Sequence, residues 1–442
     1  MTEADQAAAD RGLMRNRAFL AIWGAQILSQ TAANAVTSAL IILVAELTHS
    51  NTSSSLLILL AILPAVLFGV AAGMIVDRVD KRLVLVITNT LRAASIIPLL
   101  LFGTSLTVVY LVNFLVAAVT IFFVPAEAAT LPAIVRKREL LVANSLFTFT
   151  FNAAFLVGFI ILAPIIVSLA GYELLWVVIA FMFSISSILC STLPQPSAPA
   201  ERLGPHVAAQ VAGIAVARTR AGISDAFHFL RQAPLVSWSL VYIALTYTLV
   251  AMAGALAPGF VREVLRVGER NVVILVGPAG IGVIAGLAFL NLIGSRWSRP
   301  HAIGTGLILA FAALLALAAA RPVADVFARV GSPGLGEAFP IFAAIISLIA
   351  FVFGISYAFV TVPAMTLLQE DLREDIRGRV FGFLNTLVSV FSLAPLILVG
   401  PFADVWGVAP VFVAAALVVG GVFIAGKSTR DSAVRAPKIV TE

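Results

Sequence analysis

Long apolar stretches separated by short polar segments follow one another along almost the whole chain, and this pattern predicts membrane-spanning helices. A bilayer core about 30 Å thick is crossed by a helix of roughly 20 residues, whose backbone hydrogen bonds are all internal. The apolar positions are continuous rather than alternating, which favours helices over the strands of a barrel. Twelve runs are long enough, near residues 18–46, 53–76, 83–102, 105–127, 141–169, 172–193, 234–261, 272–293, 301–320, 339–363, 378–402 and 408–426.

The composition narrows the class of protein in the same direction. Of the 442 residues 61% are hydrophobic and 11% are charged, and the mean hydropathy is +1.07. A soluble domain carries about 25% charged residues. So few charges cannot cover a water-soluble protein of this size, which excludes a soluble enzyme and a disordered chain. The single cysteine, Cys190, excludes an intrachain disulfide and with it a disulfide scaffold.

The distribution of Lys and Arg predicts which side of the membrane each loop faces, because cytoplasmic loops are enriched in both. With a cytoplasmic N-terminus, the few basic loop residues left on the opposite side are Arg262, Arg266, Arg270, Arg321 and Arg329. Both termini of a multi-pass protein of the cell membrane are therefore expected in the cytoplasm. The net charge of +6 is then a signal of topology, and no nucleic acid partner is expected. The polar segment 1–17 shows no signal-peptide cleavage site, so the first span is expected to be retained.

The predicted spans form two halves on either side of a polar segment. We expect a six-helix bundle in residues 1–194, a cytoplasmic linker in residues 195–232, and a second six-helix bundle with a tail in residues 233–442. The linker is rich in proline at its start, and its later part predicts an amphipathic helix that lies on the membrane surface.

Two short patterns recur in the same order in both halves. The second and eighth spans carry Gly69-xxx-Gly73 and Gly282-xxx-Gly286, and the fourth and tenth end on Val-Pro-Ala at residues 124–126 and 362–364. A repeat of six spans keeps its orientation, which predicts a pseudo-two-fold axis along the membrane normal. We expect both glycine pairs to be places of close helix packing.

The loop after the second span concentrates charge at a helix end. It reads Gly73-Met74-Ile75-Val76-Asp77-Arg78-Val79-Asp80-Lys81-Arg82. Asp77 can face the positive N-terminal end of a neighbouring helix, and the arginines can pair with acids on nearby loops. Such a cluster can hold two bundles together on one side of a membrane.

At this loop the chain resembles the major facilitator superfamily, whose pattern there is G-x-x-x-D-R/K-x-G-R/K-R/K. The chain departs from the pattern at Asp80, where glycine is usual, and it matches at Gly73, Asp77, Arg78, Lys81 and Arg82. Segments 125–144 and 377–382 are similar to the macrolide-efflux and siderophore-exporter branch. The resemblance implies two bundles that rock about a central site, a direction of efflux, and gating roles for the matching residues. The drug-antiporter signature of the fifth span and the arginine signature of the fourth are absent, which weakens the case for proton-coupled drug antiport.

Arg92 is the one ionisable residue predicted well inside a span. It lies about 16 Å along the helix from Lys81, near the membrane midplane, where a charge is costly and marks a functional position by default. It can bind an anionic group of a substrate or make hydrogen bonds within the protein. No carboxylate is expected at that depth, which argues against an internal ion pair.

A stripe of polar side chains marks one face of the first span. The spacing of four places Gln26, Gln30 and Asn34 on the same helix face, and amides facing lipid would be unsatisfied. The stripe therefore faces a wet cavity or makes helix–helix hydrogen bonds. The full set of predicted substrate-binding residues is Gln26, Gln30, Asn34, Arg92, Asn113, Tyr242 and Tyr357.

These features predict an all-α secondary active transporter of a small amphipathic molecule, acting as a monomer in the lipid bilayer. Proton coupling stays open, and no cofactor or metal is expected, because the four histidines are scattered along the chain. An enzyme is not expected either, since the phosphate-loop pattern at residues 421–428 ends a span instead of following a strand. Two alternatives are a lipid or lysolipid flippase on the same fold, in which Arg92 would meet an anionic headgroup, and a non-transporting scaffold or receptor.

Overall fold

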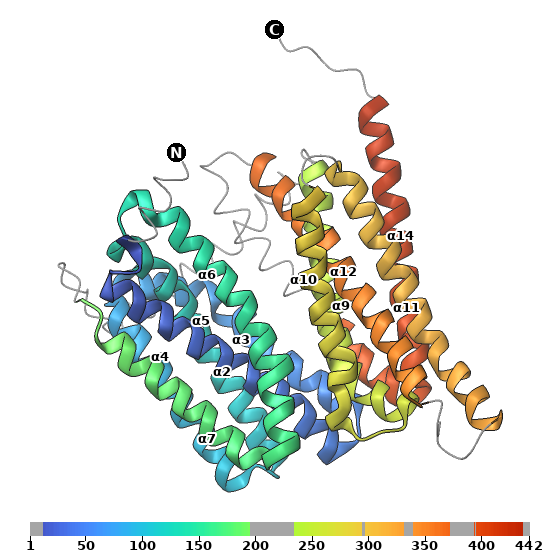
Figure 1. Ribbon diagram of the computed structural model, residues 1–442, viewed down its shortest axis with the longest axis horizontal. Coiled ribbons are helices and arrows are strands. Elements are labelled where there is room, and N and C mark those ends of the chain that lie inside the picture. The colour runs from blue at the N-terminus through green and yellow to red at the C-terminus, as the bar shows by residue number, and fades with distance from the viewer. Residues whose placement is uncertain are drawn as a thin grey trace. The chain divides into compact units, whose positions relative to one another are not determined.

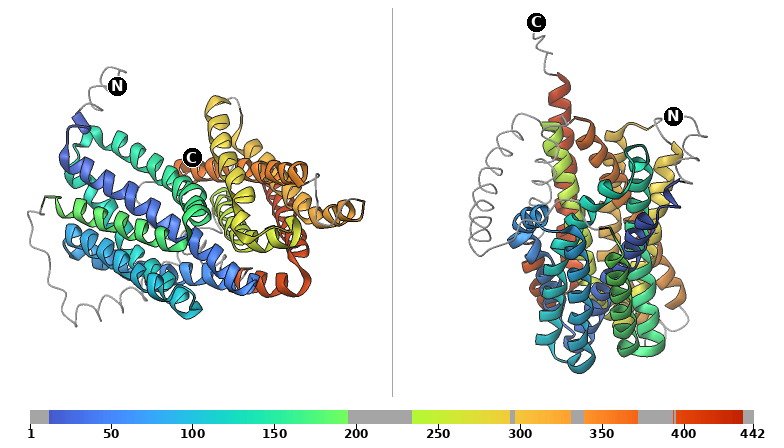
Figure 2. Two further views of the ribbon diagram at one scale, coloured as in Figure 1. Left: turned by 60° about the horizontal axis from the view of Figure 1, so that its bottom comes forward. Right: turned by 90° about the vertical axis from the view of Figure 1, so that its left-hand side faces the viewer.

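The computed structural model describes residues 12–194, 234–293, 297–330, 339–371, 393 and 395–435. All regular elements within these ranges are helices, as Figures 1 and 2 show from three directions. Ten helices of the described part are long and apolar enough to cross a membrane, and a shorter apolar helix spans Pro395–Trp406. The predicted class of an all-α membrane protein is confirmed. The linker 195–232 and the segment 377–382 lie outside the described residues, and the count of twelve spans and the pseudo-symmetry stay predictions.

The chain divides into two compact units. The N-terminal unit comprises residues 1–47 and 59–219, and the C-terminal unit comprises residues 48–58 and 220–442. Helix α3 (Asn51–Arg78) therefore begins in the C-terminal unit and continues in the N-terminal one. The other long helices of the N-terminal unit are α2 (Arg17–Thr48), α4 (Lys81–Phe102), α5 (Leu106–Ile134), α6 (Leu140–Phe155) and α7 (Ala163–Ser191).

The C-terminal unit is built around one central helix. Helix α12 packs against α9, α10 and α11, and α14 packs against α11 and α9 (Figure 1). In the N-terminal unit α4 has the comparable role against α5 and α7. The helices of the C-terminal unit are α9 (Pro234–Phe260), α10 (Val273–Ile293), α11 (Arg299–Val330), α12 (Phe339–Asp371) and α14 (Val408–Arg435), besides Pro395–Trp406.

The fifth and sixth predicted spans meet at a glycine. A seven-residue π-helix, Leu156–Leu162, joins α6 to α7, so that residues 137–191 form an almost continuous helical segment. The segment leaves helical geometry at Gly171, which has φ 79° and ψ 179°. Such a positive φ suits glycine because it has no Cβ. The break lies where the sequence places the boundary between spans 141–169 and 172–193.

Two helices extend beyond the ends that the sequence predicts. Helix α5 continues through Pro125 and Pro132 to Ile134, and α12 continues through Pro363 to Asp371. The expectation that Val-Pro-Ala ends these spans is therefore wrong in both halves. Proline is tolerated inside membrane helices because neighbouring groups satisfy the freed backbone. The extension of α5 brings Glu127 into the helix interior.

The two glycine pairs have different surroundings. A Cβ on Gly282 would lie 2.0 Å from the carbonyl oxygen of Phe351, and one on Gly286 would lie 2.8 Å from the Cβ of Ala358. Gly354 makes the reciprocal approach, since its Cβ would lie 1.9 Å from the carbonyl oxygen of Ala279. Close packing is thus confirmed for the pair on α10, which meets α12. It is not confirmed for Gly69 and Gly73 on α3, where an added Cβ would meet nothing within 4 Å among the described residues.

We expect Gly282→Ala to lower the midpoint temperature of unfolding in detergent. The added methyl group would be driven into the backbone of α12, and overpacking of this kind costs about 1–3 kcal/mol. Gly69→Ala is the matched control: it meets no neighbour, and alanine is favoured over glycine in a helix by roughly 1 kcal/mol. Equal midpoint temperatures for the two variants would contradict the close seam between α10 and α12.

Candidate functional site

Arg92 lies where four helices of the N-terminal unit meet. It belongs to α4, is 1% exposed, and donates a hydrogen bond from Nη1 to the Ser29 Oγ of α2 at 2.7 Å. Its guanidinium carbon is 4.5 Å from the ring centroid of Phe123 on α5 and 5.7 Å from that of Phe183 on α7. Both rings stabilise the cation through their negative faces. The charge is therefore held inside the helix bundle of this unit.

A carboxylate shares this interior. Glu127 on α5 is 6% exposed and interacts electrostatically with Arg92. The two side chains make no direct ion pair, because Arg92 Nε, Arg92 Nη2 and Glu127 Oε1 are all buried and without a hydrogen-bond partner. The sequence argument gave Arg92 no acidic neighbour, whereas Glu127, the last residue of the predicted fourth span, lies close enough to interact with it. Sequence reasoning placed Glu127 at the edge of the membrane and did not predict this interaction.

Further polar groups extend from this pair. The hydroxyl of Ser29 donates to Asn89 Oδ1 at 2.9 Å, and Asn89 Nδ2 donates to the backbone oxygen of Leu85 at 3.0 Å and to Cys190 Sγ at 3.8 Å. We call Ser29, Asn89, Arg92, Glu127 and Cys190 the Arg92 cluster. An unsatisfied buried polar group costs about 1–3 kcal/mol, and a charged one costs more. A cluster with three such atoms is therefore suited to take up a small polar species, such as a proton or a water molecule.

The polar stripe of the first span makes contacts within its own unit. Gln26 Nε2 donates to the backbone oxygen of Phe147 at 3.2 Å, and Gln26 Oε1 accepts from the Thr150 hydroxyl at 3.1 Å. These bonds tie α2 to α6. Asn34 Nδ2 donates to the backbone oxygen of Gln30 on its own helix at 2.8 Å. Gln26 thus serves helix–helix hydrogen bonding, and a substrate contact for any of the three stays a prediction.

The remaining predicted binding residues are divided between the two units. Asn113 is buried on α5 of the N-terminal unit. Tyr242 on α9 lies against Trp238, with ring centroids 5.7 Å apart. Tyr357 on α12 meets Tyr247 of α9 edge to face, with centroids 6.1 Å apart. The tyrosines therefore form aromatic contacts of the C-terminal unit, separate from the Arg92 cluster.

The loop that matches the family pattern is organised by helix ends. Asp80 caps α4, since its carboxylate accepts from the backbone N–H of Arg82 at 2.9 Å and of Leu83 at 3.5 Å. This cap gives a physical reason for aspartate where the pattern has glycine. Lys81 Nζ donates to the backbone oxygen of Asp77 at 2.8 Å, and the Arg82 guanidinium donates to the backbone oxygen of Ser191 at the end of α7.

These contacts do not yet explain gating. Asp77 is exposed, and within the described residues no ion pair joins Asp77 or Arg78 to an acid or base of another loop. Arg82 meets the negative C-terminal end of a helix rather than an acid, which is a favourable place for a cation. The gating roles of Gly73, Asp77, Arg78, Lys81 and Arg82 stay predictions.

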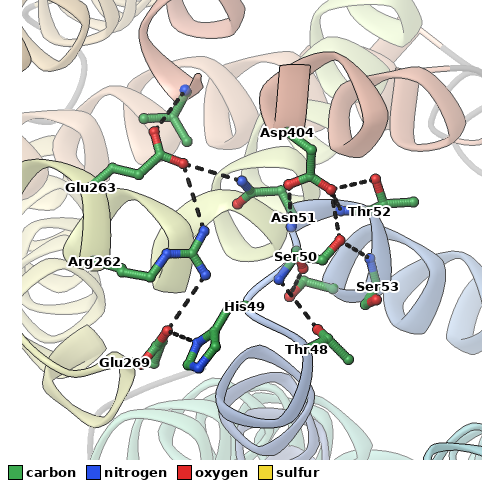
Figure 3. A network of polar contacts seen from close by, with 12 residues as sticks. Thr48, His49, Ser50, Asn51, Thr52, Ser53, Arg262, Glu263, Glu269 and Asp404 are labelled. Carbon is green, nitrogen blue, oxygen red and sulfur yellow. Dashed lines mark hydrogen bonds and ion pairs between the residues drawn. The ribbon is translucent and has the colours of Figure 1, made fainter. Parts of the chain in front are cut away.

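A second polar network occupies one end of the C-terminal unit (Figure 3). Asp404, in the last turn of Pro395–Trp406, accepts hydrogen bonds from the hydroxyls of Ser50 and Thr52, each at 2.6 Å. It also accepts from the backbone N–H of Asn51 at 2.7 Å and of Thr52 at 3.0 Å. Asp404 could not be singled out from the sequence, because polar residues at span ends are common.

Three more charged side chains extend this network. Glu263 accepts from Asn51 Nδ2 and from the backbone N–H of Val408, both at 3.4 Å. Arg262 lies 3.5 Å from Glu269, and His49 Nδ1 lies 2.8 Å from the same carboxylate (Figure 3). Figure 3 shows these groups converging from α3, from the end of α9 and from the loop after it.

Asp404 lies two residues beyond the predicted eleventh span, and its hydrogen bonds set its ionisation. Partial burial alone would raise the pKa of the carboxyl, but the bonds from Ser50, Thr52 and the backbone of Asn51 outweigh burial and lower it. All of these bonds go to the ionised form. The group is therefore a carboxylate at neutral pH, and the arrangement weakens only as the pH falls through the lowered pKa.

Two bacterial efflux proteins are similar in sequence to most of the chain. It is 25% identical over 388 residues to the multidrug efflux pump Tap of Mycolicibacterium fortuitum. The aligned region covers 85% of this chain and 86% of Tap. It is 23% identical over 401 residues to macrolide efflux protein A of Streptococcus pyogenes, covering 88% and 90% of the two chains.

Solved structures show the same fold at low sequence identity. The nucleoside transporter NupG is 14% identical, with a TM-score of 0.67 over 93% of this chain and 98% of that one. A bacterial homologue of the human lysosomal transporter Spinster is 13% identical, with a TM-score of 0.68 over 94% and 98%. The family model described as Major Facilitator Superfamily matches residues 22–395. The chain is a multi-pass membrane transporter that belongs to the major facilitator superfamily.

Proposed function

We propose that this transporter exports a small amphipathic molecule across the cell membrane by alternating access, with both termini in the cytoplasm. The observation that carries the proposal is the near full-length similarity to two proteins whose names describe efflux pumps. Macrolides and similar amphipathic antibiotics are therefore the first compounds to test. Buried amides and tyrosines beside many apolar side chains suit such a cargo, whereas a sugar would demand more hydrogen-bonding groups.

We further propose that Glu127 carries the coupling proton. Its carboxyl is buried among apolar groups, and one oxygen lacks a hydrogen-bond partner. A buried charge is costly unless it is paired or neutralised. Glu127 is the buried acid that faces the Arg92 charge, so proton uptake changes how strongly α5 is attracted to α4. Binding and release of the proton can in this way be linked to a shift between those helices.

The flippase alternative is not favoured by the position of Arg92. An anionic headgroup would need to reach the guanidinium, but Arg92 is enclosed by α2, α5 and α7 and is 1% exposed. A receptor or scaffold would have no need of a buried pair with unsatisfied atoms. We therefore propose a monomeric exporter and no second function.

Export is tested by accumulation of labelled macrolides and other amphipathic compounds in cells that lack their own pumps, with and without this gene. We expect lower accumulation of at least one compound, and the decrease should vanish when the membrane is de-energised. Equal accumulation of every compound in well-expressing cells would contradict the proposal.

We expect Glu127→Gln to abolish proton movement on addition of substrate to inverted vesicles, measured with a pH-sensitive dye. The amide has the same shape but cannot exchange a proton, so any remaining transport should lose its dependence on the proton gradient. Glu173→Gln is the matched control, because Glu173 is an exposed acid on α7 of the same unit. Unchanged proton movement in Glu127→Gln during demonstrated transport would remove Glu127 as the carrier.

Arg92→Gln is expected to lower thermal stability by about 1–3 kcal/mol, since it removes the charge-assisted hydrogen bond to Ser29 and the cation near the Glu127 carboxyl. The double variant Arg92→Gln, Glu127→Gln should recover part of this loss, because the two side chains interact and their effects are not additive. The measurement is a double-mutant cycle by thermal unfolding in detergent. Simple additivity would show that the two groups are not energetically coupled.

A further inference from the structure

Helix α3 is shared by the two units, and its first turns are held by the C-terminal one. Residues 48–58 belong to the C-terminal unit and residues 59–78 to the N-terminal unit, although α3 runs without interruption from Asn51 to Arg78. Any movement of one unit relative to the other must bend α3 or release its first turns, because α3 belongs to both. The contacts that hold those turns are therefore candidates for a controlling element.

The first contact is a helix cap supplied by another helix. The N–H groups of a helix's first turn have no partner within the helix and need an acceptor from elsewhere. Ser50 caps the N–H of Ser53 at 3.3 Å within its own chain segment. Asp404 satisfies the preceding N–H groups, those of Asn51 and Thr52, and it also binds the hydroxyls of Ser50 and Thr52. Its negative charge is further favoured by the positive end of the helix dipole.

The second contact is a close approach of backbones. A Cβ on Gly400, one turn before Asp404, would lie 2.6 Å from the Cα of Thr52 and 2.7 Å from the Oγ of Ser55. A Cβ on Gly259 of α9 would lie 1.9 Å from Asn51 Oδ1. Ser55 is buried by this packing, and its hydroxyl has no hydrogen-bond partner. Gly259 and Gly400 thus allow the first turns of α3 to pack closely against α9 and the helix Pro395–Trp406.

The Asp404 contacts are open to competition from solvent. The hydrogen bonds to Ser50 and Thr52 lie at an exposed position, where water can replace either partner. Glu263 accepts from the backbone N–H of Val408 at the start of α14 and also from Asn51 Nδ2, each at 3.4 Å, so it supports the start of α3 through longer hydrogen bonds than Asp404 does. Titration at neutral pH is not the trigger, since the Asp404 carboxyl stays ionised there, with Ser50, Asn51 and Thr52 facing it. No basic side chain contacts Asp404 among the described ion pairs.

We propose that Asp404 is a releasable cap, which fixes the first turns of α3 on the C-terminal unit and lets go when this end of the transporter opens. The proposal rests on the proposed function, because it assumes alternating access and an extracellular position for this end. Asp404 then acts as a positioning residue: it sets the balance between closed and open states and touches no substrate.

Release can be measured without transport. Ser55→Cys, in a Cys190→Ser background, places a thiol under the contact between α3 and Gly400. A membrane-impermeant maleimide added to intact cells should modify it slowly. Asp404→Ala should raise the rate of modification at least about fivefold, since the loss of a helix cap shifts an equilibrium by roughly this factor. Asp404→Asn should give an intermediate rate, because an amide keeps one acceptor oxygen and loses the charge.

The matched control is Tyr172→Phe. It removes a hydrogen bond of 2.9 Å from the Tyr172 hydroxyl to Glu46, within the N-terminal unit, and should leave the modification rate of Ser55→Cys unchanged. Melting temperatures near that of the parent would exclude general unfolding as the cause of faster labelling.

Each outcome separates the two proposals. An unchanged rate in Asp404→Ala would overturn the releasable cap, even where export is normal. A faster rate of labelling, together with no export of any compound by the protein that retains Cys190, would leave the cap standing and remove the proposed function. Labelling that occurs in inverted vesicles and not in intact cells would overturn the extracellular position, and with it the cap as stated.

Discussion

Hydrocarbon offers no hydrogen-bond partner, and this constraint governs most of the structure. Backbone groups are satisfied within helices, and most buried polar side chains bond to a carbonyl oxygen one turn away or on a neighbouring helix, as Gln26 does with Phe147. Against that background the Arg92 cluster is an exception. A cation and an acid lie inside one unit, and three of their polar atoms have no hydrogen-bond partner. Ionisable groups in such an interior are rare, which makes them the first candidates for function.

The two polar regions place different demands on the protein. The Arg92 cluster is buried in one unit, with the rings of Phe123 and Phe183 near the guanidinium, and in the proposed mechanism its charge state changes how α4 and α5 attract one another. The Asp404 network lies at an exposed position, where its bonds compete with water. A transporter needs both kinds of interaction: an interior group that responds to a ligand or proton, and peripheral contacts that hold a state without making it permanent.

The sequence predicted the spans well, because length and apolar composition are almost sufficient for a membrane helix. The position of the break near Gly171 also followed from the pattern. The ends of α5 and α12 did not, because both helices continue beyond the predicted runs 105–127 and 339–363, to Ile134 and Asp371. Arg92 was found because a charge stands out in an apolar run. The interaction of Glu127 with Arg92 and the contacts of Asp404 were not predicted, because both acids lie near span ends and because their partners, such as Arg92 and Ser50, are distant in sequence.

The glycine seam between α10 and α12 has a mechanical consequence. With Gly282, Gly286 and Gly354 bringing backbone against backbone, neither helix can slide along the other without driving main-chain atoms into carbonyl oxygens. Helices α10 and α12 thus form a rigid pair within their unit. Any deformation of the unit is expected in the helices around this pair. On α3, by contrast, an added Cβ on Gly69 or Gly73 would meet nothing within 4 Å in the described part of the chain, so this pair makes no comparable seam there.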